Sequence, residues 1–299
     1  MKISQKRIRN IIREAVYDAQ MGIGDSFTDV ERQEIENIVQ HILPDLQTLQ
    51  NESFNKAYLL ESVVGGDNFS KIVSLRVEGD ICFDMDGVLV DFAGGVSNIA
   101  GSIENMQYLS RPTQQQVGDL TTLATPVATP TGAFGSIGSS VATFLVDIAG
   151  RVKHMLSRGK YKPAGFIASN VNEVYQMMQV LGQSPTFRQR FWQTLPLNIE
   201  GMQLFERCQN ELPNKVGILT SPLLNSILDT VEGKKRWIGS NLVGSPPDFV
   251  VMDGNKQRYA VNDAGLPNLL IDDWDFNLTG FKAAGGLTAL FRNGVLQIV

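Results

Sequence analysis

The 299-residue chain is poor in cysteine and histidine, and this limits the chemistry that it offers. Its two cysteines, Cys82 and Cys208, lie far apart, one in a segment that we expect to be a strand and one in an expected helix. Such a pair favours a reduced intracellular protein over a scaffold held together by disulfides. The two histidines, His41 and His154, are too few for a metal site built on imidazole ligands.

Long hydrophobic runs and an excess of positive charge are also absent. A membrane-spanning helix needs about 18 or more consecutive apolar residues, and the nearest candidate, SSVATFLVDIAGRV, is interrupted by Asp147 and Arg151. We therefore expect no membrane partner. The polar first 20 residues lack the apolar segment of a signal peptide, which favours a cytoplasmic protein. The net charge of −5 gives no general case for nucleic acid as partner.

The chain does contain enough apolar residues for a full core, at 43% of the total. In its second half, short apolar segments alternate with helical ones, which is typical of a parallel sheet covered by helices on both faces. We expect strands at ICFD, KVGILT, DFVVM, NLLID and LTALF, and helices at IEGMQLFERCQ, GKKRWIGSNL and DFNLTGFKAAGG. The sequence therefore predicts an α/β fold.

Residues 1–70 are expected to form an N-terminal helical region. Residues 8–16 place apolar side chains on one stripe with basic residues opposite. Thr28 and Glu31 have the spacing of a capping box ahead of a second helix. Pro44 should end or kink that helix.

The remaining chain divides into a core and an insertion. The core comprises residues 71–91 and 196–299, and begins with an expected strand at KIVSLRVE, where apolar and polar residues alternate. Residues 92–195 interrupt it. In this insertion, a loop at residues 120–140 that is rich in Thr, Gly and Pro is expected to be flexible, and three helices should follow, the last beginning at SPTFRQRFWQTL.

The strongest functional signal is DMDGVLVD, in which three acidic residues surround one glycine directly after an apolar strand. Asp84 and Asp86 are two positions apart, so at a strand end they face the same way. They would converge at the carboxyl edge, where open α/β sheets bind ligands. Neighbouring carboxylates repel unless a cation joins them. Oxygen ligands of this kind suit Mg²⁺, which also accepts a substrate phosphate.

Further polar residues follow other expected strands in the same way. Thr220 and Ser221 end ILTS and can hold phosphate oxygens. Lys256 follows DFVVM as a cation, and Asp272 and Asp273 end LLIDD. Each feature alone is commonly a helix cap or a solvated side chain, and DxDG alone also occurs in calcium loops and turns. Together, in the order acid, hydroxyl, lysine, acid, they indicate a metal site that handles phosphate.

This order resembles the haloacid dehalogenase (HAD) superfamily of phosphohydrolases. DMDGVLVD is similar to its first motif, Thr220 to its second, Lys256 to its third and the IDD of LLIDD to its fourth. FWQTLP, GKKRWIGSNL and LIDDWDFNLTGFKAAGG resemble segments of 5′(3′)-deoxyribonucleotidases and of nucleotidase-like bacteriophage proteins. The resemblance covers residues 78–102 and 191–294. It implies a HAD-like Rossmannoid sheet with an inserted helical cap, to which the N-terminal helical region is extra.

The resemblance also implies a Mg²⁺-dependent phosphomonoesterase that works through an aspartyl-phosphate. Asp84 would be the nucleophile, and Asp86 would act as general acid and then general base. The metal would be held by Asp84, by the backbone carbonyl of Asp86 and by Asp273. Asp272 would lie nearby or bridge to the metal through water.

Thr220 and Lys256 would bind the phosphoryl oxygens, with Lys256 also neutralising the charge that develops during transfer. Asn277 would orient a metal-bound water. The implied substrate is a small phosphomonoester, in the first place a nucleoside monophosphate. The segment after the first motif, DFAGGVSNIAGS, offers only Phe92 as an aromatic partner for a base. Nucleic-acid ends and sugar phosphates stay open as alternatives.

A different class of function also stays open, namely a bacteriophage virion or interaction protein that retains the fold. Basic residues crowd the first 14 positions. A basic amphipathic helix can bind nucleic acid, an acidic partner or a membrane surface, or it can pack on its own domain with a solvated basic face. The opening MKISQKRIRNIIREA resembles the starts of many phage proteins, virion components among them. For a phage-encoded chain we expect the host cytoplasm, with virion association as the alternative. The complete set of catalytic positions favours the enzyme.

Overall fold

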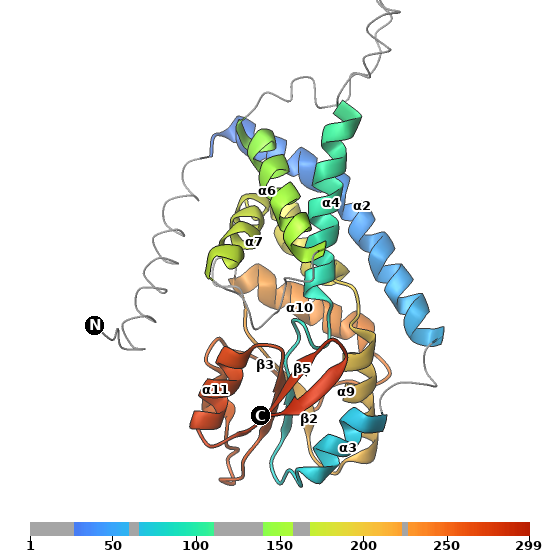
Figure 1. The fold of residues 1–299 in the computed structure, drawn as a ribbon, viewed down its shortest axis with the longest axis vertical. Helices are drawn as coiled ribbons and strands as arrows, with labels where there is room; N and C mark the ends of the chain where they lie inside the picture. Colours follow the sequence, from blue (N-terminus) through green and yellow to red (C-terminus); the bar gives the residue numbers. More distant parts are fainter. Residues whose placement is uncertain (1–26, 60–65, 111–139, 158–167, 223–226) are drawn as a thin grey trace, which may run out of the picture.

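The computed structural model describes residues 27–59, 66–110, 140–157, 168–222 and 227–299. They form a six-stranded sheet flanked by helices and a further group of helices beyond one end of the sheet (Figure 1). The strand order is β3-β2-β1-β4-β5-β6, in which β1 to β5 are parallel and β6 is antiparallel. The expected α/β protein with a mainly parallel sheet is confirmed.

Five of the six expected strands are present, and the structure adds one that the sequence did not predict. The strands are β1 (Ile81–Phe83), β2 (Val216–Thr220), β3 (Val250–Met252), β4 (Leu269–Asp272), β5 (Leu287–Arg292) and β6 (Val295–Ile298). Every residue of β1, β2 and β4 is buried, as expected of strands covered on both faces. The additional β6 returns from β5 through Asn293 and Gly294, which both have positive φ. Asn-Gly is the strongest short hairpin signal in a sequence.

The helices of the described residues include those expected in the core and in the insertion. They are α2 (Asp29–Leu59), α3 (Gly66–Ser74), α4 (Phe92–Ser110), α6 (Ser140–Ser157), α7 (Ala168–Leu181), α8 (Pro185–Arg190), α9 (Ile199–Glu211), α10 (Ile227–Asn241) and α11 (Asp275–Ala283), with short 3-10 turns η2 (Trp192–Thr194) and η4 (Lys256–Tyr259). Ser184 caps α8 by accepting a hydrogen bond from Phe187 N, ahead of Pro185 in the first turn. The sequence did not predict α4, which starts directly after the acidic loop.

KIVSLRVE does not form the expected strand, because α3 covers its first half and packs against β6. Phe69 and Ile72 are buried while Val73 is 48% exposed, so the apolar residues follow a helical spacing that begins before the alternating stretch. Asn68 fixes the helix to the edge hairpin by accepting a hydrogen bond from Leu296 N at 2.9 Å. The strand prediction was wrong because so short an alternation also fits one face of a helix.

The helix α2 continues through Pro44, so of the two expected outcomes the end of the helix is wrong, and the kink stays a prediction. The proline is exposed, whereas Ile42 and Leu43 in the same turn are buried in the core. Burial of that face outweighs the backbone hydrogen bond that proline cannot donate. At its start, the helix has the expected capping box, with Thr28 N 2.8 Å from Glu31 Oε2 and Glu31 N 3.3 Å from Thr28 Oγ1.

The helix α2 shares one hydrophobic core with the helices of the insertion. Ile35, Ile38 and Val39 are buried in the cluster that includes apolar residues of α4 and α6. It packs against α4, α6, α7 and α8, and lies alongside them in Figure 1. The expected basic helix at residues 8–16 and the loop at residues 120–140 lie outside the described residues.

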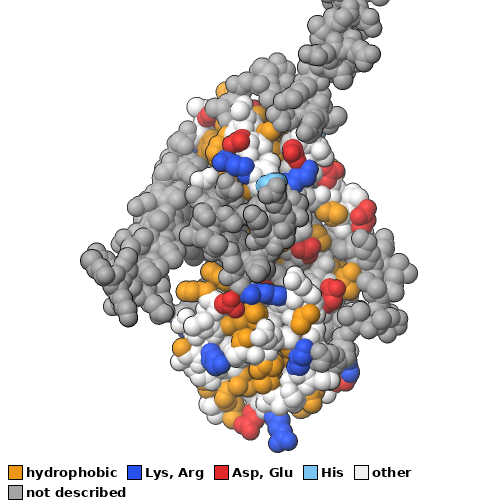
Figure 2. Space-filling view, viewed as in Figure 1, with side chains coloured by type: hydrophobic (Ala, Val, Ile, Leu, Met, Phe, Trp, Pro, Cys, Tyr) orange, Lys and Arg blue, Asp and Glu red, His pale blue; other side chains and the backbone are white. Residues whose placement is uncertain are grey.

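The two cysteines of the chain are buried and are not joined by a disulfide. Cys82 in β1 and Cys208 in α9 are both free, and burial raises the pKa of each thiol to about 12. Across the described part of the chain, no helix is long and apolar enough to cross a membrane. On the upper part of the face in Figure 2, acidic and basic side chains lie near one another. Arg151 and Asp147 form one such surface ion pair, with Arg151 Nη2 2.9 Å from Asp147 Oδ2.

The course of α2 predicts that Pro44→Ala stabilises the protein. Alanine restores the backbone donor and removes the ring from a helix interior, where proline is about 3 kcal/mol less favourable. We expect the free energy of unfolding to rise by roughly 1–3 kcal/mol in chemical denaturation. Ile42→Ala, on the buried face of the same helix, should lower it by about 2–5 kcal/mol. A less stable Pro44→Ala protein would show that the core requires the proline.

Candidate metal and phosphate site

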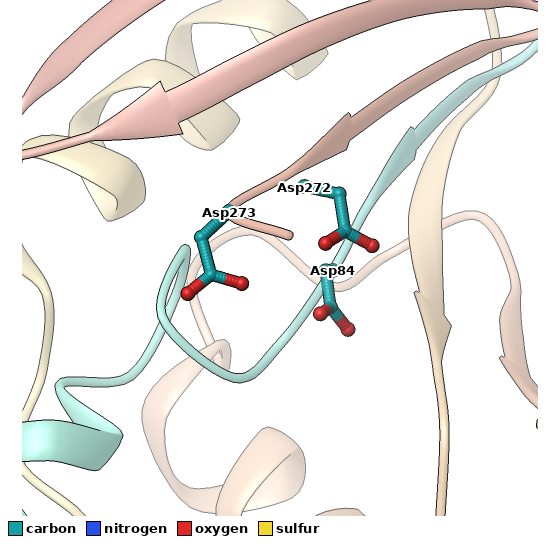
Figure 3. Close-up of side chains that lie close together, drawn as sticks. All are labelled: Asp84, Asp272 and Asp273. Atoms are coloured by element: carbon teal, nitrogen blue, oxygen red, sulfur yellow. The ribbon is translucent and has the colours of Figure 1, made fainter. Parts of the chain in front are cut away.

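Three carboxylates meet at the carboxyl end of two neighbouring central strands (Figure 3). Asp84 directly follows β1, Asp272 ends β4, and Asp273 comes next. Each offers an oxygen within 4.8 Å of the others. Since Phe83 is in register with Ile271 in the parallel pair, the residues after both strands come level at the same edge. The convergence of Asp84 and Asp273 that the sequence predicts is present.

Lys256 is the buried cation of this group. Its ammonium group lies 2.9 Å from Asp84 Oδ1 and 2.7 Å from Asp272 Oδ2, and only 2% of its side chain is exposed. Burial alone would lower the pKa of Lys256, but Asp272 and Asp84 outweigh burial and raise the pKa above its usual value. The lysine therefore stays charged and holds two of the three carboxylates together.

Protein donors already satisfy the carboxylate of Asp272. Its Oδ1 accepts a hydrogen bond from Trp274 N at 2.8 Å, and its Oδ2 accepts from Lys256 and from Asn277 Nδ2 at 2.9 Å. The side chain is completely buried. Asn277, which the sequence resemblance links to a metal-bound water, here donates to this carboxylate. Asp272 is thus built to hold Lys256 and Asn277 in place.

Asp273 differs, because no donor among the described residues reaches its carboxylate. Burial, followed by the charges of Asp272 and Asp84, raises the pKa of Asp273 well above its usual value. An acid in this position is stabilised by a cation. Three carboxylates at this spacing can hold a metal ion, and hard oxygen donors suit Mg²⁺ or a similar divalent cation. The choice of Mg²⁺ stays a prediction.

The loop after β1 can approach Asp273 only because residue 87 is glycine. Gly87 has a φ of +79°, and a Cβ atom there would lie 2.2 Å from Asp273 Oδ2. Other residues would meet both backbone strain and a clash. The loop is held by a hydrogen bond from Gly87 N to Val90 O at 3.0 Å and by one from Asn198 Nδ2 to Gly87 O at 3.1 Å. The glycine of DMDG thus lets the two acidic loops come together.

Asp86 is paired with a second buried lysine and is not part of the group of three carboxylates. Its Oδ2 lies 2.6 Å from Lys234 Nζ. Its Oδ1 is buried and has no hydrogen-bond partner within the described part of the chain. Burial, opposed by Lys234 and reinforced by Asp84, raises the pKa of Asp86. The side chain of Asp86 therefore has a different task from that of Asp84, Asp272 and Asp273.

Lys234, in α10, is the site residue that the sequence analysis missed. It is completely buried, and its ammonium group donates to Asp86 Oδ2, to Thr220 Oγ1 at 2.9 Å and to Ser221 O at 2.9 Å. A lysine ammonium has three donors, so all are used. Its Nζ also lies 4.8 Å from the centre of the Trp192 ring, within the range of a cation–π contact. One cation thus links Asp86 to the end of β2.

The sequence contained a signal for Lys234 in the pattern of its helix. Thr230, Trp237 and Ile238 are buried, and Lys234 lies on the same stripe at helical spacing. A lysine within a buried stripe requires a partner for its charge. The adjacent Lys235 is exposed on the other face, so the two lysines of GKKRW can be told apart by their place in the helical period.

The expected phosphate-binding residues belong to two different groups. Thr220 ends β2, beside β1, and its buried hydroxyl accepts from Lys234. Ser221 follows, and its hydroxyl donates to Asp253 O at 3.4 Å. Lys256 belongs to the group of Asp84 and Asp272. The two groups flank the end of β1, because β2 and β4 are its neighbours on either side.

An aromatic cluster adjoins Lys234. Phe92 stacks on Trp192 with ring centres 5.8 Å apart and meets Phe191 edge-on at 6.1 Å. Phe187 in turn stacks on Phe191 at 5.0 Å. The sequence indicated only Phe92, because the other rings come from α8 and η2, in a distant part of the chain.

A scan against models of known protein families gives no match to this chain, and a search of curated proteins gives none either. Function is therefore inferred from the site itself. The site combines three carboxylates that can hold a metal, two buried lysines, and a half-buried acid, Asp86, with one buried and unpartnered oxygen.

Because like charges surround Asp273, Asp273→Asn should stabilise the protein in the absence of metal. We expect Mg²⁺ to stabilise the unmodified protein, by about 2.7 kcal/mol at 100 times its Kd. The same change should abolish this stabilisation. Thermal unfolding with and without Mg²⁺ measures both effects. Asp275→Asn is the matched control, because this acid is exposed and paired with Arg292, and it should leave the Mg²⁺ effect unchanged. An undiminished Mg²⁺ effect in Asp273→Asn would rule out this metal site.

Proposed function

We propose that the protein is a HAD-type phosphomonoesterase in which Asp84 takes the phosphoryl group. Two acids that stand two positions apart and have different partners carry the proposal. Asp84 lies in the group of three carboxylates, and Asp86 is paired with Lys234. The strand order, with β1 between the strands that carry Thr220 and Asp272, is in keeping with a HAD-like Rossmannoid sheet. The helices inserted after β1 are in keeping with a cap domain of that superfamily.

Asp84 is held in the orientation that nucleophilic attack requires. Its Oδ1 accepts hydrogen bonds from Met85 N at 2.8 Å and from Lys256, which leaves Oδ2 for the phosphorus. As the bond from Oδ2 to phosphorus forms, the bond from phosphorus to the leaving oxygen breaks. A Mg²⁺ ion bound by Asp84 and Asp273, with the backbone carbonyl of Asp86 as a further ligand, would supply the positive charge that lets two anions meet.

Asp86 is the proposed general acid and general base. The unpartnered Oδ1 is the atom that would meet the leaving oxygen, while Lys234 holds Oδ2. In the first step, Asp86 gives its proton to the leaving oxygen. In the second, it takes a proton from water as the water oxygen bonds to phosphorus and the bond from phosphorus to Asp84 breaks. Inorganic phosphate and the free alcohol are the products.

Lys256 and Thr220 would bind the phosphoryl oxygens between them, and the buried charge of Lys234 would lie beside them. Lys256 reaches this region from the side of β4, and Thr220 and Lys234 reach it from the side of β2. Fixed positive charges and hydroxyl dipoles in a buried site stabilise the charge that builds up on a transferring phosphoryl group. Ser221 extends the end of β2 and offers a further hydroxyl.

Nucleoside monophosphates are the proposed substrates, and the aromatic cluster is the support for this choice. Phe92 is partly exposed and stacks on Trp192, next to Lys234. Stacking of a base on an aromatic side chain contributes about 1–3 kcal/mol. Sugar phosphates lack such a ring. The basic helix as a protein-binding element and the association with a virion concern residues beyond those described and stay predictions.

The proposed chemistry predicts Mg²⁺-dependent release of phosphate from nucleoside monophosphates. Asp84→Asn should abolish turnover, because an amide cannot form the acyl phosphate, and Asp86→Asn should slow it by at least ~10²-fold. Phosphate release is measured over a panel of nucleotides, sugar phosphates and phosphorylated oligonucleotides, with Asp275→Asn as an active control. The enzyme hypothesis fails if folded protein with Mg²⁺ hydrolyses no member of the panel.

Lys234 and Lys235 offer a matched pair of substitutions. Lys234→Met keeps the buried volume but leaves Asp86 without its cation, so we expect kcat/KM to fall by roughly 10²–10³-fold, as for other fixed electrostatic contacts to a transition state. Lys235→Met changes an exposed side chain that pairs with Glu232 at 3.2 Å, and its kcat/KM should stay within twofold. If the two substitutions lowered kcat/KM equally, Lys234 would have no role in the proposed site.

A further inference from the structure

We infer that α2 is a positioning element of the active site and that Glu36 is the positioning residue on it. The inference rests on the proposed function, and it assigns a task to a helix that precedes every proposed catalytic residue in the chain. Glu36 does not reach the site itself. It acts through the segment from Ser184 to Thr194, which carries Trp192 and covers Lys234.

Glu36 joins α2 to the start of α8. One of its carboxylate oxygens accepts a hydrogen bond from Ser184 Oγ, and the other accepts from Thr186 Oγ1 and from Gln40. Ser184 is completely buried and uses the same hydroxyl oxygen to accept from Phe187 N at 3.0 Å. A hydroxyl has one proton. By taking that proton, Glu36 fixes the rotamer in which Ser184 caps α8.

The contact between Glu36 and α8 involves an ionised acid. Burial alone would raise the pKa of Glu36, but the hydrogen bonds from Ser184, Thr186 and Gln40 outweigh it and hold the pKa below its usual value. Hydrogen bonds to a charged acceptor are roughly twice as strong as neutral ones. The junction between α2 and α8 is therefore stronger than an ordinary contact between two surface helices.

A second contact holds the other end of the segment. Gln50 Nε2 donates to Gln193 O in η2 at 2.9 Å. Gln50 lies 14 positions after Glu36 on the same helix, which corresponds to about 21 Å at 1.5 Å per residue. One helix thus holds both ends of the segment that contains α8 and η2, so the segment cannot shift without breaking one of two hydrogen-bonded ends.

This segment is the cover of Lys234. Trp192 is 3% exposed, and its ring lies 4.8 Å from Lys234 Nζ. The fit between η2 and α10 is close, because a Cβ atom on Gly233 would lie 2.7 Å from Trp192 Cβ. A displaced Trp192 would admit water to the ammonium group and loosen its bonds to Asp86 and Thr220. Glu36 is therefore coupled to the acid–base residue through Trp192 and Lys234.

The test is Glu36→Gln, in which an amide has only one oxygen to accept from two hydroxyls. We expect kcat to fall on the order of tenfold, the scale of one lost charge-assisted hydrogen bond, with KM within twofold. Glu52→Gln is the control, because it makes the same change at an exposed position of α2 and should retain full kcat. Ser184→Ala breaks the same contact from the other side and should reproduce the effect, and it replaces Glu36→Gln if that protein does not fold.

Two further measurements separate positioning from general stability. In a double-mutant cycle, Glu36→Gln should add no loss of kcat to Lys234→Met, because the coupling runs through that lysine. Hydrogen exchange at residues 184–194 should speed up in Glu36→Gln and not in Glu52→Gln, and this readout needs no enzymatic activity. An inactive wild-type protein that still shows the exchange effect would refute the proposed function while confirming the junction. Unchanged kcat, unchanged exchange or an undiminished loss in the Lys234→Met background would each overturn the inference.

Discussion

The constraint on which the site depends is the balance of charge at the carboxyl end of β1. Four carboxylates, those of Asp84, Asp86, Asp272 and Asp273, are gathered there against two buried lysines. With every group ionised, an excess of two negative charges would remain in a poorly solvated place, which is costly. Without a metal, burial and the neighbouring acids raise the pKa values of Asp86, Asp272 and Asp273, which favours the neutral forms of these acids. One divalent cation would cancel this excess. The ammonium group of Lys256, which has two partners, would then have a donor for a phosphoryl oxygen.

The sequence predicts the residues at the strand ends well because the carboxyl ends of parallel strands lie at the same edge of the sheet. Buried strands that each end in a polar residue bring those residues to one edge, so Asp84, Asp272 and Asp273 could be placed together without coordinates. Lys234 could not be found in that way, since it lies on a helix and reaches the site across the sheet edge. Its signal is a charge within an apolar stripe, which depends on the phase of the helix.

The errors in the fold have similar physical causes. At KIVSLRVE, the short alternation of apolar and polar residues predicts a strand. In the structure, Phe69 and Ile72 are buried at helical spacing, and Asn68 hydrogen-bonds to Leu296 in the hairpin of β5 and β6. At Pro44, local propensity predicts the end or a kink of the helix, but burial of the neighbouring apolar side chains continues the helix through this residue. The contact of Glu36 with Ser184 spans 148 positions and joins two polar residues. No periodic pattern marks such a pair, so this link was visible only in the structure.

The two lysines divide the site according to what supports them. Lys256 is held by Asp84, which follows β1, and by Asp272, which ends the adjacent β4. The proposed nucleophile and the residues that would hold the metal therefore depend on the sheet. Lys234 is covered by Trp192, whose segment is fixed by α2, so the proposed acid–base group, Asp86, depends on the helical part. A disturbance of the helices should therefore impair proton transfer more than metal binding. In the proposed mechanism, the described parts of the insertion and the N-terminal helix would act on the chemistry through Lys234, although neither supplies a proposed reacting group.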